Sequence, residues 1–428
     1  MFAFLYTLFI RLSYGLAQVA ALFHPKTQKW VKGQQNIWKS LAKSDAFPQK
    51  DTSRSSLCIW FHSASLGEFE QGRPVIEACR KLYPNAKIVL TFFSPSGYEH
   101  RQNYDQVDII TYLPLDTPTN VSRFLDIVRP DIALFIKYEF WYHYLSELKK
   151  RQVPALLFSA IFRPNQLFFK SYGGFYRKLL FCLDTILVQN QASAQLLQQI
   201  HYPNVIIAGD TRLDRVVQIA SQARNYPLIK AFKGDSPLMI VGSAWPDDLD
   251  VIIPFINQFR KPLKVVVAPH EIDAEQIKKY QQQLQVPTAT YLEQLPQGHI
   301  SPETCVLFLD TVGMLSAMYR YADFVFVGGA FKDGLHNTME PAVFGMPIFF
   351  GQPYFKKFQE ALDLLRLGGA ITVKNTQEFE KTFTELYDDL TLRRKKGEIC
   401  RTYVHQNSGA TEKVMQQISQ ILNKKILG

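Results

Sequence analysis

The sequence predicts an α/β protein of two doubly wound, Rossmann-like domains that face each other across a cleft, preceded by an apolar N-terminal helix. From about residue 57, short apolar strands alternate with helical segments, which is the pattern of a parallel sheet covered on both faces. The alternation restarts after a polar stretch near residues 222–235. A chain of 428 residues, 47% of them hydrophobic, is long enough for two cores of ordinary size.

The first segment, MFAFLYTLFIRLSYGLAQVAALF, contains one charged side chain, Arg11. Its length could just span a bilayer, although Arg11 near the centre would cost about 3 kcal/mol. Tyr6, Tyr14 and the lysines at 26, 29 and 32 suit a membrane interface. We therefore expect residues 1–24 to form a helix that anchors in or on the membrane, with its basic flank toward anionic lipid. A buried first helix is the alternative.

The first domain, expected over residues 25–221, contains the first series of strands. Each is a short apolar run, and helical patterns such as Thr119–Val128 and Tyr142–Arg151 lie between them. The strand candidates are Leu57–Phe61, Lys87–Phe93, Asp108–Tyr112, Asp131–Ile136, Pro154–Ser159, Thr185–Val188 and Asn204–Ile207.

Residues 161–181 of this domain, IFRPNQLFFKSYGGFYRKLLF, interleave aromatic and basic side chains. Such a surface could stack single-stranded nucleic acid, face lipid, or be an amphipathic helix on the core. The net charge of +10 fits either anionic partner. Because the apolar N-terminus favours lipid, we expect anionic membrane lipid and not nucleic acid as a partner.

The second domain is expected over residues 222–405, and residues 406–428 are expected to form a helix, Ala410–Leu427, that packs back on the body. The strand candidates of this domain are Leu238–Val241, Lys264–Ala268, Val306–Leu309, Phe324–Val327 and Pro347–Phe350. Five scattered cysteines without a CxxC pair argue against a disulfide framework or a zinc site. They favour a reducing compartment.

The segment 328–351, GGAFKDGLHNTMEPAVFGMPIFFG, is the most informative about function. A strand runs into Gly328-Gly329, and Glu340-Pro341 opens an apolar helix. Glycines let the backbone approach a ligand, and free N–H groups at a helix start suit a phosphate. Glu340 could hold the hydroxyl pair of a ribose. At the carboxyl end of parallel strands, this layout predicts a nucleotide site.

Three further turns of the second domain place small residues or backbone N–H groups on the same side. They lie at 241–245, 268–271 and 310–314, so several turns converge on a nucleotide pocket. Asp248 and Asp250 have the spacing of a metal-binding pair, but they follow a helix start, and N-capping explains them better. We expect no metal and no cofactor.

Three charged residues of the first domain are candidates for catalysis. Glu68 ends the motif HSASLGE at a helix start, where it could remove a proton from an attacking hydroxyl or simply complement the helix dipole. Glu139 follows another strand and could fix an acceptor, although the local sequence alone favours a cap or a surface glutamate. Arg212 in GDTRLD could hold a phosphate or carboxylate at two points, or form a linker salt bridge.

Together these motifs resemble the 3-deoxy-D-manno-octulosonic acid (Kdo) transferase family of lipopolysaccharide synthesis. The resemblance covers nearly the whole chain. It is most specific in HSASLGE at 62–68, YLPLDTP at 112–118, RPDIALFIKYEFW at 129–141, GDTRLD at 209–214 and GLHNTMEPAVFGMPIFFG at 334–351. It implies a GT-B glycosyltransferase at the cytoplasmic face of the inner membrane. The enzyme would invert the anomeric centre without a metal, with CMP-Kdo as donor and a lipid A precursor as acceptor.

The resemblance also implies roles for individual residues. Glu68 would be the general base, and Glu139 and Arg212 would support the transition state; Arg212 stands where the family usually has lysine. With the neighbouring strand-end turns included, the expected CMP contacts are Ser243, Pro269, His270, Val312, Gly313, Met314, Gly329, His336, Asn337, Thr338, Met339 and Glu340.

Two rival functions remain open from the sequence. Another enzyme of the same fold, such as a UDP-sugar transferase or a sugar-nucleotide 2-epimerase, would share the glycine-rich second domain but would not need the apolar N-terminus. A non-enzymatic nucleic-acid-binding protein would give no reason for Glu68 in a glycine loop.

Overall fold

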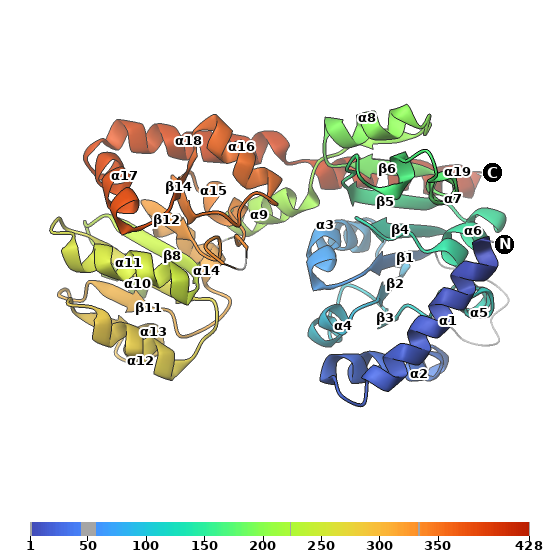
Figure 1. The fold of residues 1–428 in the computed structure, drawn as a ribbon, viewed down its shortest axis with the longest axis horizontal. Helices are drawn as coiled ribbons and strands as arrows, with labels where there is room; N and C mark the ends of the chain where they lie inside the picture. Colours follow the sequence, from blue (N-terminus) through green and yellow to red (C-terminus); the bar gives the residue numbers. More distant parts are fainter. Residues whose placement is uncertain (1, 44–56, 223, 333, 428) are drawn as a thin grey trace. The chain divides into compact units, whose positions relative to one another are not determined.

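The computed structural model describes residues 2–43, 57–222, 224–332 and 334–427 (Figure 1). The chain divides into two compact units, one of residues 1–215 and 408–428 and the other of residues 216–407. Each unit contains one seven-stranded sheet, and all the paired strands run parallel. The predicted fold class, with two doubly wound α/β sheets and an N-terminal apolar helix, is confirmed.

The first sheet has the strand order β3-β2-β1-β4-β5-β6-β7. Its order reverses between β1 and β4, and ligands of doubly wound proteins bind at the carboxyl ends of the strands at such a reversal. All the strand candidates of this domain are confirmed with small shifts of their ends. The strands are β1 Cys58–Ser63, β2 Lys87–Phe92, β3 Ile109–Tyr112, β4 Ile132–Ile136, β5 Ala155–Ala160, β6 Thr185–Val188 and β7 Val205–Ile207.

Helices cover both faces of this sheet because its strands are apolar on both sides (Figure 1). On one face, Trp60 packs against Phe124 and Tyr144, with ring centroids 5.0 and 5.5 Å apart. On the other, Phe69 packs against Phe92 at 5.8 Å. The helices are α3 Leu66–Leu82, α4 Pro95–Arg101, α5 Pro118–Val128, α6 Tyr142–Lys150, η1 Leu167–Phe169, α7 Gly174–Leu180, α8 Gln191–Gln199 and α9 Thr211–Ser221.

The last helix, α19 (Ala410–Leu427), has the predicted range and belongs to the first unit. It packs on α3, where the Cys79 thiol lies 3.5 Å from the Met415 sulfur. The hydroxyls of Tyr83 and Ser419 are 3.0 Å apart. The buried side chains of α19 join the core of this unit, so the C-terminal helix completes one face of the first sheet.

The second sheet has the order β10-β11-β9-β8-β12-β13-β14, which reverses between β8 and β12. The strands are β8 Leu238–Ala244, β9 Lys264–Pro269, β10 Thr288–Thr290, β11 Val306–Phe308, β12 Phe324–Val327, β13 Ile348–Gly351 and β14 Ala370–Val373. The helices are α10 Pro227–Lys233, α11 Pro246–Gln258, α12 Ala274–Gln283, α13 Tyr291–Gln294, α14 Leu315–Met318, η2 Tyr319–Tyr321, α15 Met339–Ala342, α16 Gln359–Leu367, α17 Thr376–Asp388 and α18 Leu390–Asn407. The predicted strands are confirmed; β10 and β14 were not predicted.

The N-terminal segment forms α1 (Phe2–Ala20), followed by α2 (Pro25–Lys43). Tyr6 donates a hydrogen bond to Asp116 at 2.7 Å, and the Thr7 hydroxyl lies 2.8 Å from Nε2 of His143. No residue of α1 is buried, so the alternative of a buried first helix is wrong. Within the described part of the chain, α1 is the one helix long and apolar enough to cross a membrane.

Candidate active site

Glu68 lies in the first turn of α3, directly beyond the carboxyl end of β1. The Ser65 hydroxyl donates a hydrogen bond to its carboxylate. The Lys137 ammonium lies 3.6 Å from its other oxygen, Oε1. Because β1 and β4 are neighbours at the reversal of strand order, the turn after β4 brings Lys137 to Glu68. The side chain of Glu68 remains 19% exposed, so a ligand can reach it.

Lys137 was not predicted as a site residue. It follows β4 directly and has a φ of 73°, a left-handed conformation that is uncommon for a lysine. Such conformations cluster at functional sites, where the surrounding structure holds them. The sequence offered one signal for Lys137: it directly follows a predicted strand. The carboxyl ends of this strand and of the strand before Glu68 were both predicted to lie at one edge of the sheet.

Glu139 is buried, with a side chain only 7% exposed, so the interpretation as a surface glutamate is wrong. Its Oε2 lies 2.9 Å from Nε2 of His62 and accepts a 2.7 Å hydrogen bond from the Trp141 indole. Nδ1 of His62 lies 2.9 Å from the Thr91 hydroxyl. Buried charge needs such partners, and neither His62 nor Trp141 was singled out from the sequence. Glu139 is therefore placed to position the turn after β4 rather than to project into solvent.

Arg212 lies in the first turn of α9 and is 42% exposed. Its Nε and Nη2 donate to the same oxygen of Asp210, at 2.8 and 2.6 Å. The adjacent Thr211 hydroxyl donates to the carbonyl of Gln71 in α3 and lies 2.8 Å from the Ser159 hydroxyl at the end of β5. The predicted salt bridge of Arg212 is therefore present, with Asp210 as its partner. The Thr211 hydrogen bond joins α9 to α3, the helix that carries Glu68.

In the second unit, two glycines after β12 form the predicted close turn. A Cβ on Gly328 would lie 2.3 Å from the Ser243 carbonyl oxygen, and Gly329 has a φ of 94°. Oδ2 of Asp248 accepts from the backbone N–H groups of Trp245 and Gly329, at 2.9 and 2.8 Å. Asp248 therefore caps α11 and ties it to the glycine turn, as N-capping predicted. Burial raises its pKa to about 6.

The segment after this turn holds Glu340 at a fixed position. Glu340 accepts from the Ser316 hydroxyl at 2.6 Å and from the Asn337 amide at 3.0 Å. Thr338 and Met339 are buried, whereas Asn337 is exposed. The apolar helix predicted after Glu340 is only the single turn α15, because the chain turns at Gly345, which has a φ of 82°.

The other predicted donor-site residues follow neighbouring strands of the second sheet. Ser243, with a φ of 52°, lies at the end of β8, and Pro269 ends β9. The turn between β11 and α14 contains Val312, Gly313 and Met314. Val312 is 83% exposed to solvent. His270 and His336 lie beyond β9 and β12. The structure therefore places all these residues at one edge of one sheet.

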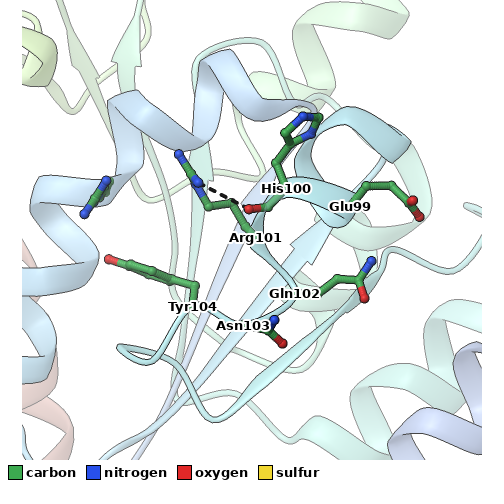
Figure 2. Close-up of a pocket in the computed structure, with 7 residues that line it drawn as sticks. Glu99, His100, Arg101, Gln102, Asn103 and Tyr104 are labelled. Carbon is green, nitrogen blue, oxygen red and sulfur yellow. Dashed lines mark hydrogen bonds between the residues drawn. The ribbon is translucent and has the colours of Figure 1, made fainter. Parts of the chain in front are cut away.

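A cavity of about 280 Å³ lies elsewhere on the first unit, at the end of α4 (Figure 2). Arg101 donates to the carbonyl of His100 at 3.2 Å and to Glu70 at 2.6 Å. The cavity is lined by Arg73, Glu99, His100, Arg101, Gln102, Asn103 and Tyr104, and so by none of the predicted catalytic residues.

Comparison with known proteins gives a consistent picture. Residues 36–215 match the family model described as 3-deoxy-D-manno-octulosonic-acid transferase (kdotransferase). The 3-deoxy-D-manno-octulosonic acid transferase of Chlamydophila psittaci is 26% identical over 90% of this chain and 88% of its own length. The transferase of the same name from Aquifex aeolicus is 25% identical over 84% of this chain and 95% of its own.

Solved structures support the fold. The UDP-GlcNAc 2-epimerase of Neisseria meningitidis, bound to UDP-GlcNAc, superposes with a TM-score of 0.60 over 85% of this chain and 100% of its own, at 14% identity. MurG of Acinetobacter baumannii gives a TM-score of 0.56 over 85% of this chain and 99% of its own, also at 14% identity.

Proposed function

Because this chain belongs to the Kdo transferase family, and is therefore a glycosyltransferase of the GT-B fold that transfers Kdo, we propose CMP-Kdo as its donor and a lipid A precursor as its acceptor. The proposal includes inversion at the anomeric carbon without a metal, which is what the family resemblance implies. The observation that supports it best is Glu68, a partly exposed carboxylate at the reversal of strand order in the first sheet.

In this mechanism the Glu68 carboxylate removes the proton of a sugar hydroxyl on the acceptor. The hydroxyl oxygen then forms a bond to the anomeric carbon of Kdo, and the bond from that carbon to the CMP phosphate oxygen breaks. Ser65 and Lys137 hold the carboxylate in position from two sides. A positioned general base of this kind contributes about 100- to 10,000-fold in rate.

Two further residues of the first unit support this chemistry in the proposal. Glu139, held by His62 and Trp141, fixes the turn that carries Lys137. Arg212 is the candidate partner for the Kdo carboxylate, since its guanidinium already holds the carboxylate of Asp210 and is 42% exposed. When Kdo binds, its carboxylate would then replace that of Asp210 as the partner of the Arg212 guanidinium.

CMP is assigned to the second unit in the proposal. The close turn at Gly328-Gly329 lets a ligand approach the backbone, and the side chain of Asn337 is exposed. The N–H groups of the two glycines are bonded to the Gly242 carbonyl and to Asp248, so the turn supplies space for the nucleotide rather than donors. The Glu340 carboxylate is fixed by Ser316 and Asn337, as a group that must recognise hydroxyls would be. The turn of Val312, Gly313 and Met314 lies at the same edge of the sheet.

The proposal places the enzyme at the cytoplasmic face of the inner membrane, held by α1. One side of α1 packs on the first unit, and Phe2 lies 5.4 Å from Phe175 of α7. Three aromatic residues close to Phe175 in the sequence are also exposed: Tyr172, Tyr176 and Phe181. The exposed apolar residues of α1 itself are Phe2, Phe4, Leu5, Leu8, Phe9, Leu12, Leu16 and Val19. Such a surface fits lipid with an anionic head group better than it fits water.

The test is incubation of the purified protein with CMP-Kdo and a lipid A precursor, followed by mass spectrometry of the lipid. We expect the lipid to gain the mass of at least one Kdo residue. Thermal-shift measurements with CMP and UDP accompany it, because an enzyme of the same fold that uses a UDP-sugar would be stabilised by UDP instead. Stabilisation by UDP alone, with no change in the lipid mass, would overturn the proposal.

A further inference from the structure

Three aromatic rings meet where the strand order of the second sheet reverses. Trp245 follows β8, His270 follows β9 and His336 follows β12, and these three strands are neighbours. The Trp245 and His270 rings stack with centroids 4.2 Å apart and planes at 18°. The His270 and His336 rings are 4.6 Å apart. We call Trp245, His270 and His336 the ring cluster.

A hydrogen bond within the ring cluster determines where His336 carries its proton. The Trp245 indole Nε1 lies 2.9 Å from Nε2 of His336. An indole N–H can only donate, so Nε2 must offer a lone pair. A neutral imidazole that accepts at Nε2 carries its hydrogen on Nδ1. An imidazolium would present a second N–H to the indole, and the hydrogen bond would be lost.

The surroundings of His336 favour the same neutral form. Burial and the charge of the neighbouring His270 lower the pKa of His336. Of the carboxylates on the elements around it, Asp248 and Glu340 are held by other donors. Asp248 of α11 accepts from the backbone of Trp245 and Gly329, and Glu340 of α15 accepts from Asn337 and Ser316.

We propose that Trp245 is a positioning residue that fixes His336 as the neutral, Nδ1-protonated tautomer. His336 then presents an uncharged N–H donor, not a cation, to the donor nucleotide. Among the described residues, His336 forms its one side-chain hydrogen bond through Nε2, to Trp245, so the donor at Nδ1 is available to a ligand. The identity of that ligand rests on the proposed function, whereas the tautomer does not.

The tautomer can be measured directly by NMR of the full-length protein with ¹⁵N-labelled histidine. The His336 signals are assigned by their loss in His336→Asn. We expect a protonated Nδ1 and an unprotonated Nε2. Trp245→Phe keeps the stacked ring but removes the N–H, so the pKa of His336 should rise by roughly half to one pH unit.

Trp30→Phe is the matched control, because the indole N–H of Trp30 is buried without a partner in the described part of the chain. This substitution should leave the pKa of His336 unchanged. A proton on Nε2 in the wild type, or an unchanged pKa in Trp245→Phe, would overturn the assignment.

Calorimetric titration with CMP tests the functional half of the proposal. The amide nitrogen of asparagine occupies nearly the position of Nδ1, and that of glutamine nearly the position of Nε2. We expect His336→Asn to retain CMP affinity within a few-fold and His336→Gln to lose about tenfold. Equal losses in the two variants would contradict the donor role. If the NMR result holds but the wild type binds no CMP, the proposed function fails while the tautomer assignment stands.

Discussion

A carboxylate is stable in a protein interior only where hydrogen-bond donors surround it. Glu139 meets this condition through His62 and Trp141, and the arrangement fixes the turn after β4. Glu68 differs because it is partly exposed and has an ammonium 3.6 Å away. Glu139 therefore holds the turn after β4 in place, whereas Glu68 is accessible from solvent and is the proposed base.

Asp248 gives a pH-dependent prediction. Burial raises its pKa to about 6 in the folded protein, above its value of about 4 in an unfolded chain. Its contribution to stability is therefore fully present below pH 4 and is lost as the pH rises through 6. The loss amounts to about 3 kcal/mol at most, at about 1.4 kcal/mol per pH unit.

Urea unfolding of the wild type and Asp248→Asn at several pH values measures this contribution. Asparagine can still accept from Trp245 and Gly329, but it does not titrate. The stability of the wild type relative to Asp248→Asn should fall from pH 4 to 7 and then level off. Asp250→Asn, an exposed position on the same helix, controls for the change of charge. A relative stability that rises with pH would contradict the account.

The sequence predicts individual site residues only where a residue type and a strand end coincide. Glu68 and Asp248 were placed correctly because a first-turn carboxylate has a recognisable position after a strand. His62 and Trp141 were missed because their role depends on contact with Glu139, which lies 77 residues from His62. Local sequence contains no information on such a pairing, and only the order of strands in the sheet brings the partners together.

At the scale of elements, the central strands were predicted and two outer strands were not. β10 and β14 lie at the two edges of the second sheet and have only three and four residues. Edge strands are often short and are covered on fewer sides, so their sequences lack the long apolar run of a central strand. The TAT of β10 consequently has no distinctive pattern in the sequence.

The exposed face of α1 gives a prediction at the same scale. Phe9 and Leu16 are 65% and 72% exposed, so replacing both with serine should leave the folded structure intact. Each such side chain loses about 1.5–3 kcal/mol of burial in lipid. We expect binding to vesicles that contain anionic lipid to weaken by at least about 100-fold.

Co-sedimentation with vesicles measures this change. Leu292→Ser with Leu295→Ser is the matched control, because both leucines are exposed but belong to the second unit. The control should bind as the wild type does. Unchanged binding of the α1 variant would show that this helix does not anchor the protein.

At the scale of the whole molecule, two parallel sheets have the same topological feature. In each, the order of strands reverses near the middle, and the candidate residues lie at the carboxyl ends of the strands. The alternation of strands and helices predicted both sheets, because strands buried on two faces are apolar throughout. It did not predict that α19 completes the core of the first unit rather than the second.

The proposed mechanism depends most on Glu68 as the general base. Glu378 provides a matched control in the second unit, because it also lies in the first turn of a helix, 3.6 Å from a lysine. Glu68→Gln and Glu378→Gln thus remove the same charge from the same helix position. Only the first removes the proposed base.

The most direct measurement is the rate of Kdo transfer to the lipid, followed by mass spectrometry, for the wild type and both variants. CMP affinity is measured alongside. We predict that Glu68→Gln loses about 100- to 10,000-fold in rate while it binds CMP as the wild type does, and that Glu378→Gln stays close to the wild-type rate. Transfer by Glu68→Gln at nearly the wild-type rate would contradict the account.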